Sequence, residues 1–203
     1  MKIVILDGTH NKSGMTLKLV DKFLAGVESV GPRAEVVTHD LLNGNISFCK
    51  GCGKCTEDKD PVNAKCMIVD DEMEAVKQAA LSADVLVFAT PIYEYCVSSA
   101  MKRFLERSLT LVTFKFGPTA RAKAIKGKVG VVICSSGAPF PFNHLMGITR
   151  YPKFMLNLAC KLYRCDRVIM VLAGGMAASP KLKNKWEDKA LNAGKAAALG
   201  FSE

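Results

Sequence analysis

The sequence predicts an open, parallel β-sheet with α-helices on both faces. Two observations predict it: short apolar runs rich in valine and isoleucine recur five times along the 203 residues, and amphipathic segments lie between them. Uninterrupted apolar runs are typical of parallel strands buried on both faces, and their alternation with helices is typical of right-handed crossovers. Ligands of such sheets bind beyond the carboxyl ends of the strands. We therefore expect a binding site in the loops after the first, third and fourth strands.

The first half of the chain is expected to supply three strands and two helices. The run KIVIL at 2–6 is the first strand, and apolar residues at helical spacing predict a helix over 15–30. AEVVTHDLL at 34–42 and DVLVFAT at 84–90 are the second and third strands. Between them, acidic residues precede EMEAVKQAAL at 72–81, where their charge would stabilise the first turn of a helix. The segment PIYEYCV after the third strand is expected to be a loop.

The second half continues the alternation with two strands and three helices. Ser98 or Ser99 is expected to cap a helix, because a serine side chain can accept a hydrogen bond from a free amide of the first turn. KVGVVICSS at 128–136 and VIMVLAG at 168–174 predict the fourth and fifth strands. A helix before the fifth strand and a last amphipathic helix opening at Ser179-Pro180 complete the pattern.

Length, hydropathy and charge limit the class of protein. The length suits one domain over 1–203, because a single hydrophobic core can cover it. No apolar run approaches the roughly 18 residues that span a bilayer, and MKIVILDGTHNK lacks the longer apolar region of a signal peptide. We therefore expect a cytoplasmic protein with reduced thiols and no membrane contact. The net charge of +9 is dispersed among acidic residues, so we expect no nucleic-acid partner.

The loop after the first strand, DGTHNKSGMT at 7–16, contains groups that suit a phosphate. Hydroxyl and amide side chains can donate hydrogen bonds, and the free amides of the next helix follow. These side chains are Thr9, Asn11, Ser13 and Thr16. The loop matches neither a P-loop nor GxGxxG. A polar turn capped by Ser13 explains the same residues, so the loop alone leaves both interpretations open.

The loops after the third and fourth strands could accept a planar ligand. Pro91 stiffens the first of them, and Ile92 and Tyr93 offer a flat apolar surface. A loop whose aromatic residues cover the sheet edge is the alternative. CSSGAPF at 134–140 ends the fourth strand with small polar residues. A GxSxG motif is absent, and none of the three histidines is near a nucleophile signature, which argues against a hydrolytic triad.

The order of these pieces resembles the NADPH-dependent FMN reductase family, and within it the iron–sulfur flavoproteins. The resemblance covers roughly residues 1–175. It rests on the phosphate-type loop, the C-x-G-C-x-x-C segment after the second strand, CMIVDDEM at 66–73 and TPIYEYCVSSAMKRFLER at 90–107. It implies a flavodoxin-like three-layer sandwich, with a five-stranded parallel sheet of order 2-1-3-4-5. FMN would lie at the switch point between the first and third strands.

The resemblance also implies site residues, carried over position by position. Phosphate contacts, partly through backbone amides, fall on Thr9, Asn11, Ser13, Met15 and Thr16. Ring contacts fall on Pro91, Ile92, Tyr93 and Glu94, and on Ser135, Ser136 and Gly137. Family members commonly begin the first loop with Gly-Ser-Pro-Arg, whereas this chain has Gly8-Thr9-His10-Asn11. Because the arginine is absent, either Lys12 takes its place or the affinity for phosphate is lower.

Half of the eight cysteines lie in one short insertion at about 47–68. The resemblance implies that Cys49, Cys52, Cys55 and Cys66 hold a [4Fe–4S] cluster. The C-x2-C-x2-C spacing lets three thiolates surround one cubane, but ten residues separate Cys55 from Cys66, so we expect the chain to loop out at Asp60-Pro61. A zinc ion, thiol redox chemistry and cysteines without a metal remain alternatives. The other four, Cys96, Cys134, Cys160 and Cys165, are expected to pack as small apolar residues.

The expected function is that of an FMN-dependent oxidoreductase. Electrons would come from NADH, NADPH or a low-potential carrier such as a ferredoxin-like protein, and would pass to a flavin, a quinone or the cluster. No catalytic side chain is predicted, since the redox chemistry belongs to the cofactor. The alternatives are a non-catalytic electron carrier that docks a redox partner and a structural metal-binding protein. Family members are often dimers or tetramers, and we expect that contact in the aromatic stretch 139–154. The absence of a dinucleotide fingerprint leaves the nicotinamide preference open.

Overall fold

Five parallel strands form the central sheet, in the order β2-β1-β3-β7-β8. Their bounds are β1 (Lys2–Asp7), β2 (Glu35–Asp40), β3 (Val85–Tyr93), β7 (Ile125–Ser136) and β8 (Cys165–Gly174). The computed structural model describes residues 1–30, 33–57, 65–113, 119–120 and 122–199. Numbered along the chain within this sheet, the strand order is 2-1-3-4-5, which confirms the predicted topology.

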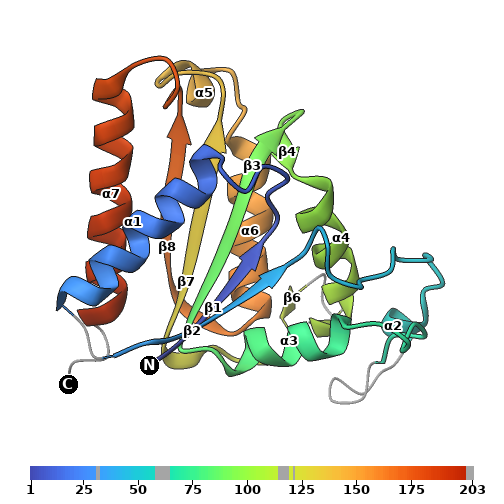
Figure 1. Cartoon of the computed structure of the whole chain (residues 1–203). Helices are drawn as coiled ribbons and strands as arrows, with labels where there is room; N and C mark the ends of the chain where they lie inside the picture. The colour runs from blue at the N-terminus through green and yellow to red at the C-terminus, as the bar shows by residue number, and fades with distance from the viewer. Residues whose placement is uncertain (31–32, 58–64, 114–118, 121, 200–203) are drawn as a thin grey trace.

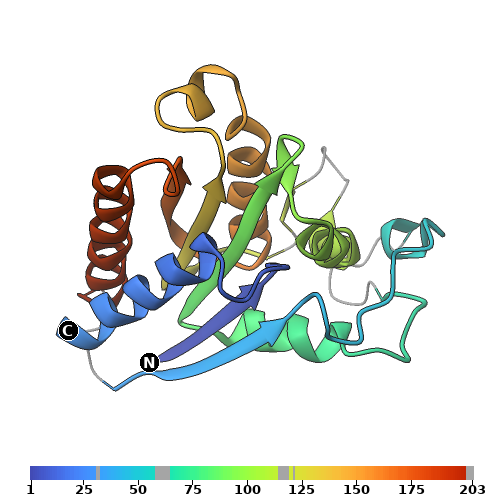
Figure 2. The same ribbon diagram turned by 45° about the horizontal axis from the view of Figure 1, so that its top comes forward.

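Helices cover both faces of the sheet and make it the middle of three layers (Figure 1). One face carries α1 (Met15–Val30) and α7 (Pro180–Leu199), and the other carries α3 (Met73–Ser82), α4 (Ser99–Arg107) and α6 (Arg150–Leu162). The shorter elements are α2 (Lys54–Glu57), β4 (Cys96–Val97), the 3-10 helix η1 (Ser108–Leu111), β5 (Val112–Thr113), β6 (Thr119–Ala120) and α5 (Phe142–Leu145). With the carboxyl edge of the sheet turned toward the viewer, Figure 2 shows α5 close to the ends of β3 and β7.

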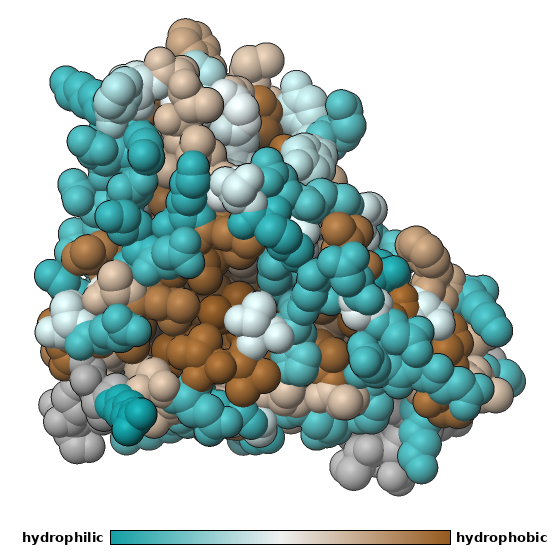
Figure 3. All heavy atoms as spheres, in the orientation of Figure 1, coloured by the Kyte–Doolittle hydropathy of each residue, from teal (hydrophilic) through white to brown (hydrophobic). Residues whose placement is uncertain are grey.

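Successive residues of β1 face opposite helical layers. Ile3 and Ile5 pack in the core beneath α1 and α7, whereas Val4 and Leu6 pack beneath α3, α4 and α6. All four are at most 2% exposed. Burying such a side chain stabilises the fold by about 1.5–3 kcal/mol, so both faces of the strand select apolar residues. The face of the molecule between α1 and β2 still shows hydrophobic residues gathered between hydrophilic ones (Figure 3).

Two glycines let α1 and α7 approach closely. A Cβ atom at Gly26 would overlap the carbonyl of Leu191, and one at Gly194 would overlap the carbonyl of Phe23. The two helices therefore meet backbone to backbone, over the apolar cluster that includes Phe23 and Trp186. Since α1 begins directly after the first loop, this contact also sets the position of that loop.

Candidate functional site

Three loops meet at the carboxyl ends of β1, β3 and β7 and line one cavity of about 230 Å³. Ten of the predicted contact residues lie on it: Thr9, Asn11, Met15, Thr16, Pro91, Ile92, Tyr93, Ser135, Ser136 and Gly137. Two predicted residues, Ser13 and Glu94, do not line this cavity. Four lining residues were not predicted: His10, Gly14, Met176 and Ala177.

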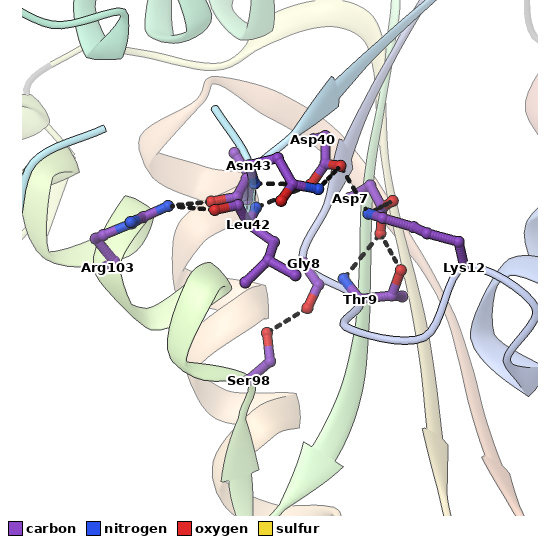
Figure 4. A network of polar contacts seen from close by, with 10 residues as sticks. Asp7, Gly8, Thr9, Lys12, Asp40, Leu42, Asn43, Ser98 and Arg103 are labelled. Atoms are coloured by element: carbon purple, nitrogen blue, oxygen red, sulfur yellow. Dashed lines mark hydrogen bonds and ion pairs between the residues drawn. The ribbon is translucent and has the colours of Figure 1, made fainter. Parts of the chain in front are cut away.

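A buried carboxylate organises the first loop. Asp7, at the end of β1, accepts hydrogen bonds at Oδ1 from the amide of Thr9 (2.8 Å) and from its hydroxyl (2.6 Å). Its Oδ2 lies 2.7 Å from Nζ of Lys12, which also lies 3.1 Å from Oδ2 of Asp40 (Figure 4). Burial lowers the pKa of Lys12, but its hydrogen bonds to the two carboxylates outweigh burial and raise it overall. Lys12 is thus held by Asp7 and Asp40 and does not line the cavity.

The rest of the first loop is ordered by its own polar groups. Oδ1 of Asn11 accepts hydrogen bonds from the amide (3.0 Å) and the hydroxyl (2.8 Å) of Ser13. The amide and the hydroxyl of Ser13 are thus both engaged within the loop, and Ser13 does not line the cavity. The hydroxyl oxygens of Thr16 and Ser135 lie 2.7 Å apart, which joins the first loop to the end of β7.

The segment predicted as a loop at 91–93 is the end of β3, so that prediction is wrong. Ile92 pairs with Val97 and Tyr93 with Cys96 in an antiparallel hairpin with β4. The turn residues Glu94 and Tyr95 have φ of 44° and 61°. Because neither is a glycine, the sequence carries no turn signal here. The hairpin buries Ile92 and leaves Tyr93 52% exposed beside the ring of His10, with the centroids 6.2 Å apart.

Ser98 is the cap of α4 and also fastens the first loop. Its Oγ accepts a hydrogen bond from the amide of Met101 (3.2 Å) and donates one to the carbonyl of Gly8 (2.6 Å). Its amide donates to Oγ1 of Thr90 (3.0 Å). The position of α4 is therefore coupled to the backbone of the loop that follows β1.

The four clustered cysteines, Cys49, Cys52, Cys55 and Cys66, line a second cavity of about 270 Å³, against the end of α4 and η1. Gly51 and Gly53 lie between them with φ of 63° and 73°, values that glycine adopts without strain, so the chain turns tightly from one thiol to the next. Burial, reinforced by the neighbouring Cys66, Cys49 and Cys52, raises the pKa of Cys55.

A set of four thiols around one cavity suits a soft metal or an iron–sulfur cluster. Among the described residues, no three side chains of cysteine, histidine, aspartate or glutamate are already gathered around one metal position. The predicted turn at Asp60-Pro61 lies outside the described residues. Of the other cysteines, Cys134, Cys160 and Cys165 are buried as predicted, and Cys96 is half-buried with its sulfur 3.8 Å from that of Met155.

In the part of the chain that the structure describes, no helix is both long and apolar enough to cross a membrane.

The relatives of the chain are named either iron–sulfur flavoproteins or FMN-dependent NADH:quinone oxidoreductases. The iron–sulfur flavoprotein of Archaeoglobus fulgidus is 30% identical over 142 residues, covering 68% of this chain and 57% of that protein. An FMN-dependent NADH:quinone oxidoreductase of Azotobacter vinelandii is 26% identical, covering 70% of this chain and 74% of that protein. The predicted resemblance is thereby confirmed. The chain spans between about half and two thirds of the length of the iron–sulfur flavoproteins it matches, at 57%, 46%, 53% and 64% of four of them.

Solved structures confirm the fold. The FMN-dependent NADH-azoreductase of Bacillus anthracis, determined in complex with FMN, superposes with a TM-score of 0.73 at 15% identity, covering 97% of this chain and 99% of that one. The NAD(P)H:quinone oxidoreductase of Methanothermobacter marburgensis gives a TM-score of 0.71 at 16% identity, covering 96% and 98%. The family model of the flavodoxin-like fold matches residues 1–198, and the chain therefore belongs to that family.

Proposed function

We propose that the chain binds FMN and acts as a flavin-dependent oxidoreductase. Electrons would pass from NADH, NADPH or a low-potential carrier to a flavin, quinone or iron–sulfur acceptor. The observation that carries the proposal is the cavity at the ends of β1, β3 and β7, because it joins a donor-rich loop to a flat surface at the switch point of the sheet. The names of the FMN-dependent relatives support it.

The residues of this cavity fit the two ends of FMN. The amides at the start of α1, with the side chains of Asn11 and Thr16, would hold the phosphate. Ile92 and Tyr93 would lie against the ring, and Gly137 leaves room on the opposite loop, since a Cβ built there meets nothing within 4 Å. FMN supplies the redox chemistry when bound. The chain would hold the ring and the phosphate in place.

Steady-state turnover distinguishes an enzyme from a carrier. The protein is purified anaerobically, its FMN content is measured, and oxidation of NADH and of NADPH is followed with a quinone as acceptor. Rapid oxidation supports the enzyme, whereas reduction only by a reduced ferredoxin supports a non-catalytic carrier. Less than about one FMN per chain after reconstitution, the stoichiometry that a single cofactor site requires, would contradict both.

We further propose that Cys49, Cys52, Cys55 and Cys66 hold a [4Fe–4S] cluster. The shared cavity and the C-x2-C-x2-C spacing support this assignment over a zinc ion, for which two separated pairs are usual. The ligands would be thiolates, and metal binding would release their protons. Thiol redox chemistry and a segment without metal are the remaining alternatives.

The exposed apolar residues between 139 and 154 support a proposed homodimer or homotetramer. They are Phe140, Phe142, Leu145, Met146, Tyr151 and Phe154, and each is at least 41% exposed. Clusters of this kind mark contact surfaces more often than free surface. We expect Phe142→Ser to lower the molar mass measured by light scattering from that of an oligomer to that of one chain. An unchanged mass would contradict this contact.

Replacing Asp7 by asparagine is expected to tighten FMN binding about fivefold. The neutral amide removes a negative charge from the base of the phosphate loop and leaves Lys12 paired with Asp40 as its remaining carboxylate. Because Lys12 offsets most of the charge of Asp7, the remaining repulsion of a phosphate is on the order of 1 kcal/mol, or about fivefold in affinity. Fluorescence titration of the apoprotein with FMN measures the effect.

Riboflavin, which lacks the phosphate, is the control ligand for Asp7→Asn, and its affinity should not change. Asp40→Asn is the matched variant, because Asp40 also pairs with Lys12 but is 35% exposed at its side chain. Solvent screens such a charge, so its effect on FMN should be smaller. Equal tightening of FMN and riboflavin would show that Asp7 does not act through the phosphate.

A further inference from the structure

Arg107, the last residue of α4, contacts both ends of the insertion at about 47–68, which carries the four clustered cysteines and is called the cysteine segment below. One terminal nitrogen donates to the carbonyl of Ser47 at 2.9 Å, and the other donates to the carbonyl of Ile68 at 3.1 Å. Ser47 precedes Cys49, and Ile68 follows Cys66. A single guanidinium group thus joins the residues at the start of the cysteine segment to the residues at its end.

Asp71 completes this junction. Its Oδ2 lies 2.6 Å from one terminal nitrogen of Arg107, and its Oδ1 lies 3.3 Å from the other. The same Oδ2 accepts a hydrogen bond from the amide of Ser47 at 2.9 Å. The side chains of Arg107 and Asp71 are each 1% exposed. A buried ion pair stabilises a fold only when its polar atoms are well partnered, and these five contacts partner both terminal nitrogens of Arg107 and both carboxylate oxygens of Asp71.

One donor of Arg107 is left over. Its Nε is buried and has no hydrogen-bond partner among the described residues. Arg107 lines the cavity of the four cysteines together with Cys66. A sulfur atom of a metal-bound thiolate or of a cluster would be an acceptor for this N–H group. Hydrogen bonds to such sulfurs orient the ligands and raise the reduction potential of a cluster.

A second arginine, one helical turn earlier in α4, contacts the residues that lead into the cysteine segment. The guanidinium of Arg103 lies over the ring of Phe48, 5.4 Å from its centroid, and donates to the carbonyls of Leu41 and Leu42 (Figure 4). Residues four apart lie on one face of a helix. The face of α4 that carries both arginines therefore contacts the start of the cysteine segment. The other end of α4 is hydrogen-bonded to the first loop through Ser98.

We propose that Arg107 is a positioning residue of the cysteine site, which closes the base of the segment and orients Cys66 toward the other three cysteines. The inference rests on the proposed cluster for its role in metal binding. Arginine suits the position because its planar fork donates four hydrogen bonds at once, two to the carboxylate and two to carbonyls, whereas a lysine ammonium has three donors.

The test uses Arg107→Lys, which keeps the charge and loses the fork and the Nε–H donor. Lys102→Met is the matched control, since Lys102 lies on the same helix, does not line the cysteine cavity, and pairs only with Glu106 among the described residues. Anaerobically purified proteins are compared for iron and acid-labile sulfide, each divided by the FMN content of the same sample. Arg107→Lys should lose more than half of the iron per FMN, and the remaining cluster should have a more negative midpoint potential. Lys102→Met should match the wild type.

Full iron content with an unchanged potential in Arg107→Lys would overturn the proposal. A second readout uses the metal-free proteins, in which the alkylation rates of the four cysteines are measured by mass spectrometry. We expect at least tenfold faster alkylation of Cys66 in Arg107→Lys. If the wild type binds no iron, the cluster assignment fails, and this readout then decides the inference: equal rates in the two proteins would overturn it.

Discussion

Cys52→Ser is expected to remove the iron from the chain and to leave FMN in place. Cys52 is the middle residue of C-x2-C-x2-C and lies on the cavity that the other three cysteines share. A serine hydroxyl fits the space of the thiol, but it is not a thiolate and is a poor ligand for iron. Iron and acid-labile sulfide should fall from about four per chain, the content of a [4Fe–4S] cluster, to below about one. The flavin cavity is built from other loops, so FMN per chain should not change.

Cys96→Ser is the matched control for this loss. Cys96 is half-buried in β4 and does not line the cysteine cavity, so its substitution should keep the iron. Loss of iron from both variants would indicate a general effect on folding. One zinc per chain in place of iron, lost in Cys52→Ser, would establish the zinc alternative. No metal in the wild type would contradict the cluster and leave the thiol or metal-free interpretations.

The fold could be predicted because its strands are buried on both faces. Residues such as Ile3 and Val4 enter different cores, so residues 3–6 of β1 are all apolar and the charged Asp7 marks the boundary with the following loop. The end of β3 could not be predicted in the same way. Pro91 and the exposed Tyr93 resemble a loop, and the two-residue turn that returns the chain to β4 uses Glu94 and Tyr95 rather than glycine. Hairpin pairing in three dimensions overrides this local signal.

The meeting of the three loops at the flavin cavity could also be predicted, but the ion pairs between the charged residues of the first loop and their partners could not. Lys12 is five residues from Asp7 and far along the chain from Asp40, and only the register of the sheet, which pairs Asp7 with Asp40, brings both carboxylates to one lysine. Met176 and Ala177 follow β8 and belong to no motif, so their place on the cavity depends on the strand order. Arg107 and Asp71 are 36 residues apart, and their contact likewise required the structure.

Gly194→Ala is expected to destabilise the fold by about 1–3 kcal/mol, although the same change in an exposed helix would stabilise it. Alanine is about 1 kcal/mol more favourable than glycine in a helix interior. At this position, however, the new Cβ overlaps the carbonyl of Phe23 and lies 2.9 Å from the amide nitrogen of Val27, so α1 and α7 must move apart. Overpacking of this kind typically costs about 1–3 kcal/mol. Unfolding by urea, followed by circular dichroism, measures the change.

Asn192→Ala separates these two effects, since Asn192 is exposed on the same helix and should give a small gain from helix propensity alone. Opposite signs for the two variants would establish that the close contact of α1 with α7 is what requires glycine at 194, and equal gains would contradict it. The contact has a consequence at the site, because α1 begins with Met15 and Thr16, which line the flavin cavity. A shift of α1 away from α7 would therefore weaken FMN binding in Gly194→Ala but not in Asn192→Ala. That result would mean that the contact between α1 and α7, although remote from the flavin cavity, sets the geometry of the end of the cavity that holds the phosphate.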